Sequence, residues 1–363
     1  MSVMSRRFGL AARRRRNASR GRPKAAAAGR SFALTFGAVV VLAIFLSPLL
    51  RAVTVSLKSN EQMTQTGSPI YPADPAKYEY KGRTYDVYQV PIDNTTKNLA
   101  LVKKGRQQSE FVDPKDPAAG RIVWVGSWRT LDQPWQFSPE WGNYAEVWDK
   151  IQFPRLLFNT VALALISLVG TVGSCILVAY GFARFRFPGR NLLFTLLIAT
   201  IFLPAAVTLI PTYTIFAKLG WVNTWLPLLV PAFFANAYDV FLLRQYFLTI
   251  PRDLDEAATI DGAGPMRILR SVVLPQAWPV IIAVSIFHFV YAWNDYFGPL
   301  IYLSGARELQ PLQVGLANFN GIYYQNPAFI QAGTMMTLLI PVILFVIFQR
   351  VFTRGIVITG VEK

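Results

Sequence analysis

The chain has 363 residues, of which 53% are hydrophobic and only 15% are charged. Ordinary soluble domains carry about 25% charged residues, so this composition argues against a soluble protein and favours one that crosses a membrane. The formal net charge is +16, and ten positive charges lie in residues 1–30. Such a segment can bind nucleic acid or an acidic membrane surface. A disordered arm that marks the cytoplasmic side also explains it, and we expect no nucleic-acid partner.

Six apolar segments are long enough to cross the hydrocarbon core of a bilayer, which takes about 20 residues of helix. They are the ranges 32–54, 156–182, 191–216, 223–246, 277–301 and 329–351. The third and fourth contain prolines, which spans tolerate only where neighbouring helices or a polar cavity re-satisfy the freed backbone groups. The predicted fold class is an all-α polytopic membrane protein with six transmembrane helices.

Lysine and arginine in the loops set the predicted orientation, because these residues concentrate on the cytoplasmic side. The loops 183–190 and 244–275 are rich in arginine, as is the segment before the first span. The alternate loops 217–222 and 302–328 hold one basic residue each. We therefore expect a multi-pass protein of the cytoplasmic (inner) membrane, in contact with lipid, with both termini in the cytoplasm.

The longest segment outside the spans follows the first one, and the orientation places it on the outer side. Four stretches in it alternate in the manner of strands, at 78–80, 84–91, 99–103 and 121–128. A short surface helix is expected at 139–144. The expected division is a basic disordered cytoplasmic tail 1–30, a first transmembrane helix 31–57, a small β-rich extracytoplasmic insert 58–138, a core 139–351 with five transmembrane helices, and a cytoplasmic C-terminal tail 352–363.

Motifs of catalysis and of nucleotide binding are absent from the sequence. The single cysteine, Cys175, and the single histidine, His288, both lie in expected spans. A His/Cys zinc site is therefore excluded, and a catalytic triad is not expected. No Gly-x4-Gly-Lys-Ser/Thr run is present, so the chain has no P-loop. We expect a protein that is not an enzyme and that holds no cofactor and no metal of its own.

The loop 251–275, between the fourth and fifth spans, has a strong helical pattern. Pro251 suits the first turn of a helix, and the three acidic residues of 253–256 lie where the helix dipole favours negative charge. Ala257 and Ala258 are small helix formers that allow another surface to approach closely. The pattern predicts a helix that begins near residue 253.

A second helix is expected at 266–272. Gly262 breaks the first helix and permits a sharp bend, and Pro275 would end the second helix and open the fifth span. The product is a bent helical pair along the membrane, with Glu256 and Arg267 available to a partner. A solvated amphipathic linker would also fit this pattern.

The loop reads, in order, Glu256-Ala257-Ala258, three residues, Gly262, nine residues, Val272, one residue and Leu274-Pro275. Further motifs surround it: Asn143-Tyr144, Phe158-Asn159-Thr160, Tyr180-Gly181-Phe182-Ala183-Arg184-Phe185, Phe187-Pro188-Gly189, Leu203-Pro204, Ile210-Pro211, Phe241-Leu242-Leu243-Arg244-Gln245, Ile260-Asp261-Gly262-Ala263 and Trp293-Asn294-Asp295. This ordered set resembles the permease subunits of ABC importers, and most closely the MalG-type permeases of carbohydrate importers. The resemblance covers about two thirds of the chain, residues 32–57 and 139–363, and leaves the insert without a counterpart.

The resemblance implies a function and a set of partners. The chain would be a permease subunit that forms half of the translocation path for a sugar or oligosaccharide. Its loop would enter a cleft of a cytoplasmic ATPase subunit as a coupling helix. The implied coupling residues are Glu256, Ala257, Ala258, Asp261, Gly262 and Arg267. The implied partners are a second homologous permease subunit, two ATPase subunits that bind the ATP, and an extracytoplasmic solute-binding protein.

Candidates for the translocation path lie near the outer end of the fifth span, where Trp293, Asn294 and Asp295 form a polar cluster. Polar groups at membrane depth usually face a cavity or a partner, and an aromatic ring beside amide and carboxylate groups suits a sugar. His288 could line the same face. Alternatively, Asn294 and Asp295 hold helices together, Trp293 anchors at the interface and His288 packs.

Two other functions remain open at this stage. One is a permease for glycerol phosphate or another organic solute, because the motifs identify the machinery and not the cargo. The other is a membrane sensor, in which residues 58–154 bind a ligand and the loop 251–275 is the output. Co-purification separates the classes, since an importer subunit should bring down an ATPase and a sensor should not.

Overall fold

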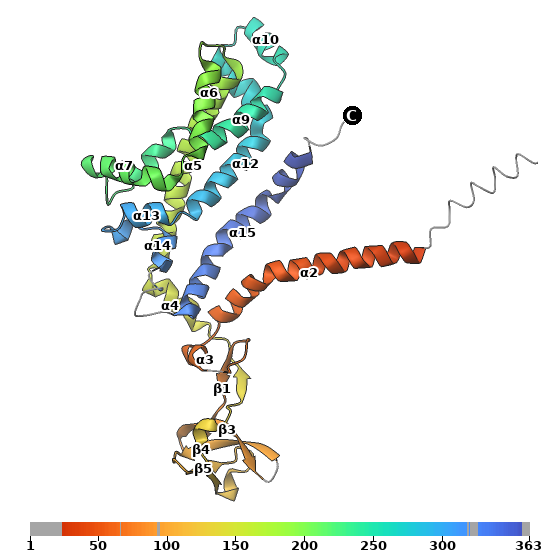
Figure 1. Cartoon of the computed structure of the whole chain (residues 1–363), viewed down its shortest axis with the longest axis vertical. Coiled ribbons are helices and arrows are strands. Elements are labelled where there is room, and N and C mark those ends of the chain that lie inside the picture. The colour runs from red at the N-terminus through yellow and green to blue at the C-terminus, as the bar shows by residue number, and fades with distance from the viewer. Residues whose placement is uncertain (1–23, 66, 93–94, 318, 320–325, 358–363) are drawn as a thin grey trace, which may run out of the picture. The chain divides into compact units, whose positions relative to one another are not determined.

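The computed structural model describes residues 24–65, 67–92, 95–317, 319 and 326–357 (Figure 1). The chain divides into two compact units, Met1–Thr54 and Val55–Lys363. The first unit carries nearly all of helix α2 (Lys24–Ser56). Because α2 begins at Lys24, the last part of the expected disordered tail is helical, while residues 1–23 lie outside the described residues.

The second unit is mainly helical, as expected. Its α-helices are α3 (Asn60–Thr64), α4 (Gly142–Lys150), α5 (Phe153–Arg184), α6 (Arg190–Ala199), α7 (Ala205–Lys218), α8 (Leu226–Leu229), α9 (Ala237–Thr249), α10 (Asp253–Ile260), α11 (Pro265–Ile268), α12 (Leu274–Trp293), α13 (Phe297–Tyr302), α14 (Leu312–Ala317) and α15 (Pro327–Val357). The shorter turns are η1 (Pro117–Ala119), η2 (Trp128–Thr130), η3 (Thr200–Phe202), η4 (Val230–Phe233), the π-helical η5 (Leu269–Val273) and η6 (Arg307–Leu309). The helix expected at 139–144 is α4, and α15 extends into the expected C-terminal tail.

Five helical segments of the described chain are long and apolar enough to cross a membrane. They are Ser31–Ser56, Phe153–Arg184, Leu226–Thr249, Pro265–Trp293 and Pro327–Gln349. The expected third span, 191–216, is not one straight helix, because Arg190–Phe202 and Ala206–Lys218 meet at 100°. Pro204 explains the break, since it has no N–H for the helix and holds Leu203 in an extended conformation. The number of helical segments that could cross a membrane is six if this bent pair forms one span.

The second helix of the loop does not end at Leu274-Pro275, so that expectation is wrong. α11, η5 and α12 form one helical run, Pro265–Trp293. The π-turn η5 ends at Val273, two residues before Pro275, and includes the residue whose carbonyl lies four positions before the proline. The wider turn relieves the clash between that carbonyl and the proline ring. The expected span 277–301 is also corrected, because the helix ends at Trp293.

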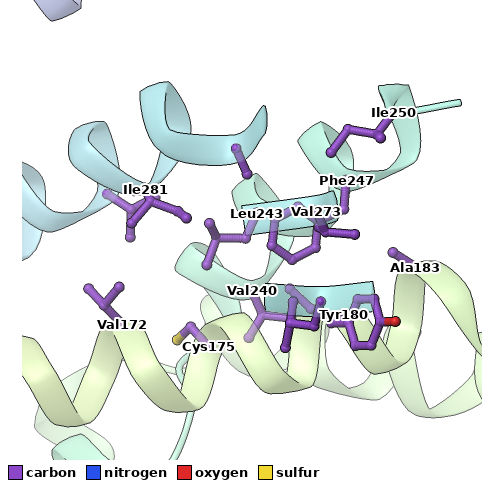
Figure 2. Packing of buried hydrophobic residues seen from close by; sticks show 14 of the residues in the cluster. Val172, Cys175, Tyr180, Ala183, Val240, Leu243, Phe247, Ile250, Val273 and Ile281 are labelled. Carbon is purple, nitrogen blue, oxygen red and sulfur yellow. The ribbon is translucent and has the colours of Figure 1, made fainter. Parts of the chain in front are cut away.

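Helices α5, α9 and α12 pack against one another around a buried apolar cluster (Figure 2). α5 contributes residues at three- and four-residue intervals, which lie on one face of a helix. Cys175 and Ala183 are among them, and they meet Leu243 of α9 and Val273 of η5, all fully buried. The hydroxyl of Tyr180 donates a hydrogen bond to the carbonyl of Pro265 at 3.0 Å. The end of α5 and the start of the fifth span are therefore held together.

The insert contains two antiparallel sheets. The larger has the order β2-β3-β4-β5-β6, from β2 (Lys77–Tyr80), β3 (Arg83–Ile92), β4 (Thr95–Lys103), β5 (Gln108–Val112) and β6 (Arg121–Val125). In the smaller sheet, β1 (Ala73–Pro75) pairs with β7 (Trp135–Phe137). The four expected strands are present as β2, β3, β4 and β6, but the last ends at Val125 and not at residue 128. Strands β1, β5 and β7 were not predicted, and in β5 the buried position 109 holds a serine, so the apolar residues do not alternate. Hydrogen bonds from Arg121 and then from Lys103 hold the pKa of the Glu110 carboxyl below its ordinary value.

Buried amide side chains fasten the base of the insert. The Asn143 side chain donates hydrogen bonds to the carbonyls of Ser56 at 2.8 Å and Lys58 at 3.0 Å. Gln62 donates to the carbonyls of Pro69 at 3.0 Å and Tyr71 at 2.7 Å. It also accepts a bond from the N–H of Ala73 at 3.1 Å. These bonds satisfy backbone groups of a segment that has little regular structure of its own.

Gln62→Ala should loosen this base. The carbonyl of Tyr71 and the N–H of Ala73 lose their side-chain partner, and the carbonyl of Pro69 keeps only its bond from Lys58. This loss should lower the free energy of local opening by about 2 kcal/mol. Hydrogen–deuterium exchange of the purified protein should show faster exchange in residues 69–75. Glu61→Ala is the matched control on the same helix, since its exposed ion pair with Lys77 contributes little. Equal exchange in the two variants would contradict this account.

Candidate functional site

Helix α10 carries the Glu-Ala-Ala sequence and is exposed along most of its length. Glu256 and Ala257 lie on its open surface, and Ala258 is partly covered. Ile260 at its end is 87% exposed and Met266 beyond the bend is 66% exposed. Charged and large apolar side chains therefore share one open surface, which is a typical composition for a protein–protein contact.

The bend after α10 depends on the backbone of Gly262. Its N–H donates to the carbonyl of Thr259 at 3.0 Å, and the N–H of Ala263 donates to that of Ala258 at 2.9 Å. This pair of bonds is the Schellman motif, which needs a left-handed residue. Gly262 has φ +76°, and a Cβ there would meet nothing within 4 Å. The backbone conformation, and not lack of space, is what calls for glycine.

Arg184, the last residue of α5, holds the loop in place. Its Nε lies 3.0 Å from Oδ2 of Asp255, and its two terminal nitrogens each donate to the carbonyl of Ile250 at 3.2 Å. In the reverse direction, Arg252 donates to the carbonyl of Ala183 at 3.2 Å. The side chain of Arg184 is 5% exposed and that of Asp255 is 19% exposed. Little water competes with this ion pair, so α10 is firmly attached to α5.

A cavity of about 660 Å³ lies between α5, α9 and α12 and the segments around α8 and α13. Its lining residues are Thr160, Leu163, Ser167, Thr171, Leu228, Leu229, Pro231, Ala232, Phe234, Asn236, Tyr238, Asp239, Phe287, His288, Tyr291, Ala292, Asp295, Pro299 and Pro311. Hydroxyl, amide, imidazole and carboxylate groups thus meet aromatic rings in one space. Such a mixture of an apolar wall and a few polar groups is usual for a binding site for a small molecule.

The structure brings two of the four path candidates to this cavity. His288 lines it, with Nε2 3.1 Å from the Ser167 hydroxyl, and so does Asp295. Trp293 is only 1% exposed and stacks on Phe289, with 5.6 Å between ring centroids. Asn294 is exposed, and its side chain donates to the carbonyl of Val290 at the helix end. For Trp293 and Asn294, the structure agrees with packing and helix capping.

Asp239 lines the cavity and was not singled out in the sequence. It is 5% exposed, accepts a bond from the Asn236 side chain at 2.6 Å, and donates its own N–H to Asn236 Oδ1 at 2.9 Å. A signal for it existed, because Asp239 is the one acidic residue of the expected span 223–246. A charge inside a span is itself a reason to suspect a functional role.

The same helices carry both the loop and the cavity wall. α5 ends at Arg184, which binds the loop, and contributes Thr160, Ser167 and Thr171 to the cavity. The continuous run Pro265–Trp293 begins at the bend and contributes His288. A displacement of the exposed loop would therefore reach the cavity through two helices.

An apolar helix bundle that carries an exposed loop and encloses a cavity with a few polar groups fits a membrane transport subunit. Comparison with known proteins agrees. Residues 175–357 match the family described as "Binding-protein-dependent transport system inner membrane component". The chain belongs to this family, so it is a permease component of the inner membrane and not an enzyme. The expected kinship with ABC importer permeases is confirmed.

Two relatives and one solved structure show how far the likeness extends. The osmoprotective compounds uptake permease protein GgtD of Synechocystis sp. is 31% identical over 277 residues, covering 76% of this chain and 93% of that protein. The sn-glycerol-3-phosphate transport system permease protein UgpE of Pectobacterium atrosepticum is 35% identical over 226 residues, which are 60% of this chain and 79% of that protein. A crystal structure of a bacterial ABC transporter involved in the import of the acidic polysaccharide alginate matches with a TM-score of 0.61 at 21% identity. The match covers 91% of this chain and 98% of the chain in that structure. This structural match shows a shared fold.

Arg184→Ala should free α10 from α5. Without the guanidinium, the Asp255 carboxylate has no cationic partner and little water around it. The attachment of the loop should weaken by about 2 kcal/mol. This is less than for a fully buried pair, because the Asp255 side chain is 19% exposed. Cleavage of the purified protein after Glu256 by a glutamate-specific protease should become roughly 30-fold faster if it requires local opening. Arg186→Ala, an exposed arginine two residues on, is the control. Unchanged cleavage of Arg184→Ala would refute the attachment.

Proposed function

We propose that this chain is one of two permease subunits of an ABC importer and forms half of the translocation path for a sugar or oligosaccharide. The exposed loop 251–275 couples that path to ATP hydrolysis on separate ATPase subunits. The observation that carries the proposal is the attachment of α10 to the end of α5 by Arg184, since α5 also lines the cavity. A loop held in this way transmits a displacement and does not absorb it.

In this mechanism two ATPases close on ATP, and each moves a loop inserted in its cleft. The movement biases two pre-existing arrangements of the helices, one open outward and one open inward. Glu256, Ala257, Ala258, Asp261, Gly262 and Arg267 are the proposed coupling residues. Ile260 and Met266 add exposed apolar contacts on the same surface. His288 and Asp295 are the proposed path residues, together with Asp239.

The proposed topology has six crossings and both termini in the cytoplasm. The bent pair α6–α7 counts as the third crossing, with residues 139–351 as the core. The arginine-rich loops 183–190 and 244–275 meet at one end of α5, which supports a cytoplasmic position for both. The insert is joined through α4 to the opposite end of α5, so it belongs on the extracytoplasmic side.

The proposed partners are a second homologous permease, two ATPase subunits and an extracytoplasmic solute-binding protein. Large apolar side chains remain exposed on α6 and α7, including Leu192, Leu196, Val207 and Ile210. Such a surface needs either lipid or the second permease. Membership of a family of transport components speaks against the alternative of a membrane sensor.

The second candidate cargo is glycerol phosphate or another organic solute, which the names of the two relatives favour. The cavity favours a sugar, because aromatic rings beside hydroxyl, imidazole and carboxylate groups offer a stacking face with hydrogen-bond partners.

Glu256→Lys should uncouple ATP hydrolysis from uptake. Reversal of the charge on the exposed face of α10 would weaken its contact with the ATPase and leave the fold intact. In vesicles that hold the whole importer, uptake should fall at least tenfold while ATP hydrolysis continues. Asp149→Lys, the same charge change at an exposed position of α4, should have no effect. Normal uptake by Glu256→Lys would show that Glu256 is not a coupling residue.

Gly262→Pro should uncouple in the same assay, because proline cannot adopt φ +76° and has no N–H for the bond to Thr259. Gly264→Ala is the matched control. The φ of Gly264 is negative and suits any residue, and a Cβ there would meet nothing within 4 Å. Uptake should survive the control and fail in Gly262→Pro, and equal uptake in both would rule out a role for the bend.

A further inference from the structure

We infer that the cavity is built for an uncharged, polyhydroxylated solute and that Asp239 and Asp295 exclude anionic solutes such as phosphate esters and acidic sugars. The inference rests on the proposed function, in that it takes the cavity to be part of the translocation path. It names the chemical class of the cargo, which neither the family nor the relatives assign to this chain.

The hydrogen bonds of the two carboxylates leave one oxygen of each available. Oδ2 of Asp239 accepts from the Asn236 side chain, and Oδ1 of Asp295 accepts from the N–H of Gly298 at 3.2 Å. Among the described residues no donor occupies Oδ1 of Asp239 or Oδ2 of Asp295. Asp239 is buried, so its open oxygen has little bulk water to pair with. An ionised carboxylate only accepts hydrogen bonds, and a solute must therefore bring donors.

The charge of the cavity wall argues in the same direction. Neither lysine nor arginine occurs among the described residues that line the cavity, while two acidic residues do. Charge effects are strong where surrounding protein displaces water. A phosphate or carboxylate entering this space would face two like charges, and it would bring acceptors to groups that already accept. Hydroxyl groups supply donors and carry no charge.

Aromatic rings complete the preference for a polyhydroxylated solute. Phe234, Tyr238, Phe287 and Tyr291 line the cavity, and each is more than half exposed. Their faces can cover the C–H side of a sugar ring while its hydroxyls turn to the carboxylates and to His288. A trimethylammonium group would also stack on such faces. It could balance the charge of the carboxylates, but it has no N–H or O–H donor and so could not hydrogen-bond to their open oxygens, as a polyol can.

The test is ATP-driven uptake into vesicles that hold the whole importer with its binding protein. The radiolabelled probes are neutral solutes (glycerol, glucose and maltose), their anionic counterparts sn-glycerol 3-phosphate and glucose 6-phosphate, and glycine betaine as the trimethylammonium solute. Wild-type protein should accumulate a neutral probe and neither phosphate ester. Asp239→Asn and Asp295→Asn should each raise the KM for that probe about tenfold, because a charge-assisted hydrogen bond becomes a neutral one.

Two controls make the result specific. Asp149→Asn removes an exposed carboxylate outside the cavity and should leave the KM unchanged. The Asp239 carboxylate also accepts a hydrogen bond from Asn236, the N-cap of α9, so its replacement disturbs the start of that helix. Asp295 lies beyond the end of α12, and Asp295→Asn therefore guards against a variant that only fails to fold.

Each alternative outcome overturns a stated part of the argument. Accumulation of a phosphate ester or of glycine betaine in preference to neutral probes, or an unchanged KM in both cavity variants, overturns the inference. The proposed function would stand in that case, provided that Glu256→Lys still abolishes uptake of the accumulated probe. If no probe of any class accumulates while the assembled complex hydrolyses ATP, the proposed function falls, and the inference falls with it.

Discussion

The ion pair between Arg184 and Asp255, with its two added bonds to the Ile250 carbonyl, is the interaction on which the arrangement of the molecule depends. It joins the end of one span to the start of a loop that would otherwise be held only by its flanking chain. Guanidinium suits this position because one planar group can reach a carboxylate and a carbonyl together. A lysine could place one charge there but could not span both acceptors.

The helical core around Cys175 and Leu243 supports the same connection from within the bundle. Its apolar contacts hold α5, α9 and α12 together (Figure 2). The Tyr180 hydroxyl adds a hydrogen bond to the carbonyl of Pro265, where the helical run Pro265–Trp293 begins. Close-packed protein interiors resist gradual deformation, so a displaced helix is expected to move as a rigid body. Rigid coupling between the exposed loop and the cavity is therefore a property of the packing as well as of one ion pair.

Much of this architecture could be predicted from the sequence, and the failures have physical causes. Apolar length located most of the helices, and Gly262 marked the bend correctly. Pro275 misled, because a π-turn lets the helix continue through a residue that usually stops one. Trp293 looked like part of a polar cluster, yet it is the last residue of α12 and stacks on Phe289 one turn earlier, while Asp295 lies beyond the helix end and lines the cavity. Contacts that join distant segments, such as Arg184 with Asp255, leave no local pattern in a single sequence.

The base of the insert has a consequence for how such a protein can change. The N–H of Glu140 donates to the carbonyl of Leu57 at 2.9 Å, so the segment that enters the insert and the segment that leaves it lie side by side. A segment whose ends meet can be gained, lost or exchanged in evolution with little rearrangement of the scaffold that carries it, because closing a longer or shorter loop between fixed ends changes the chain entropy only slowly. The same position offers protein engineers a permissive site for a reporter or an affinity module.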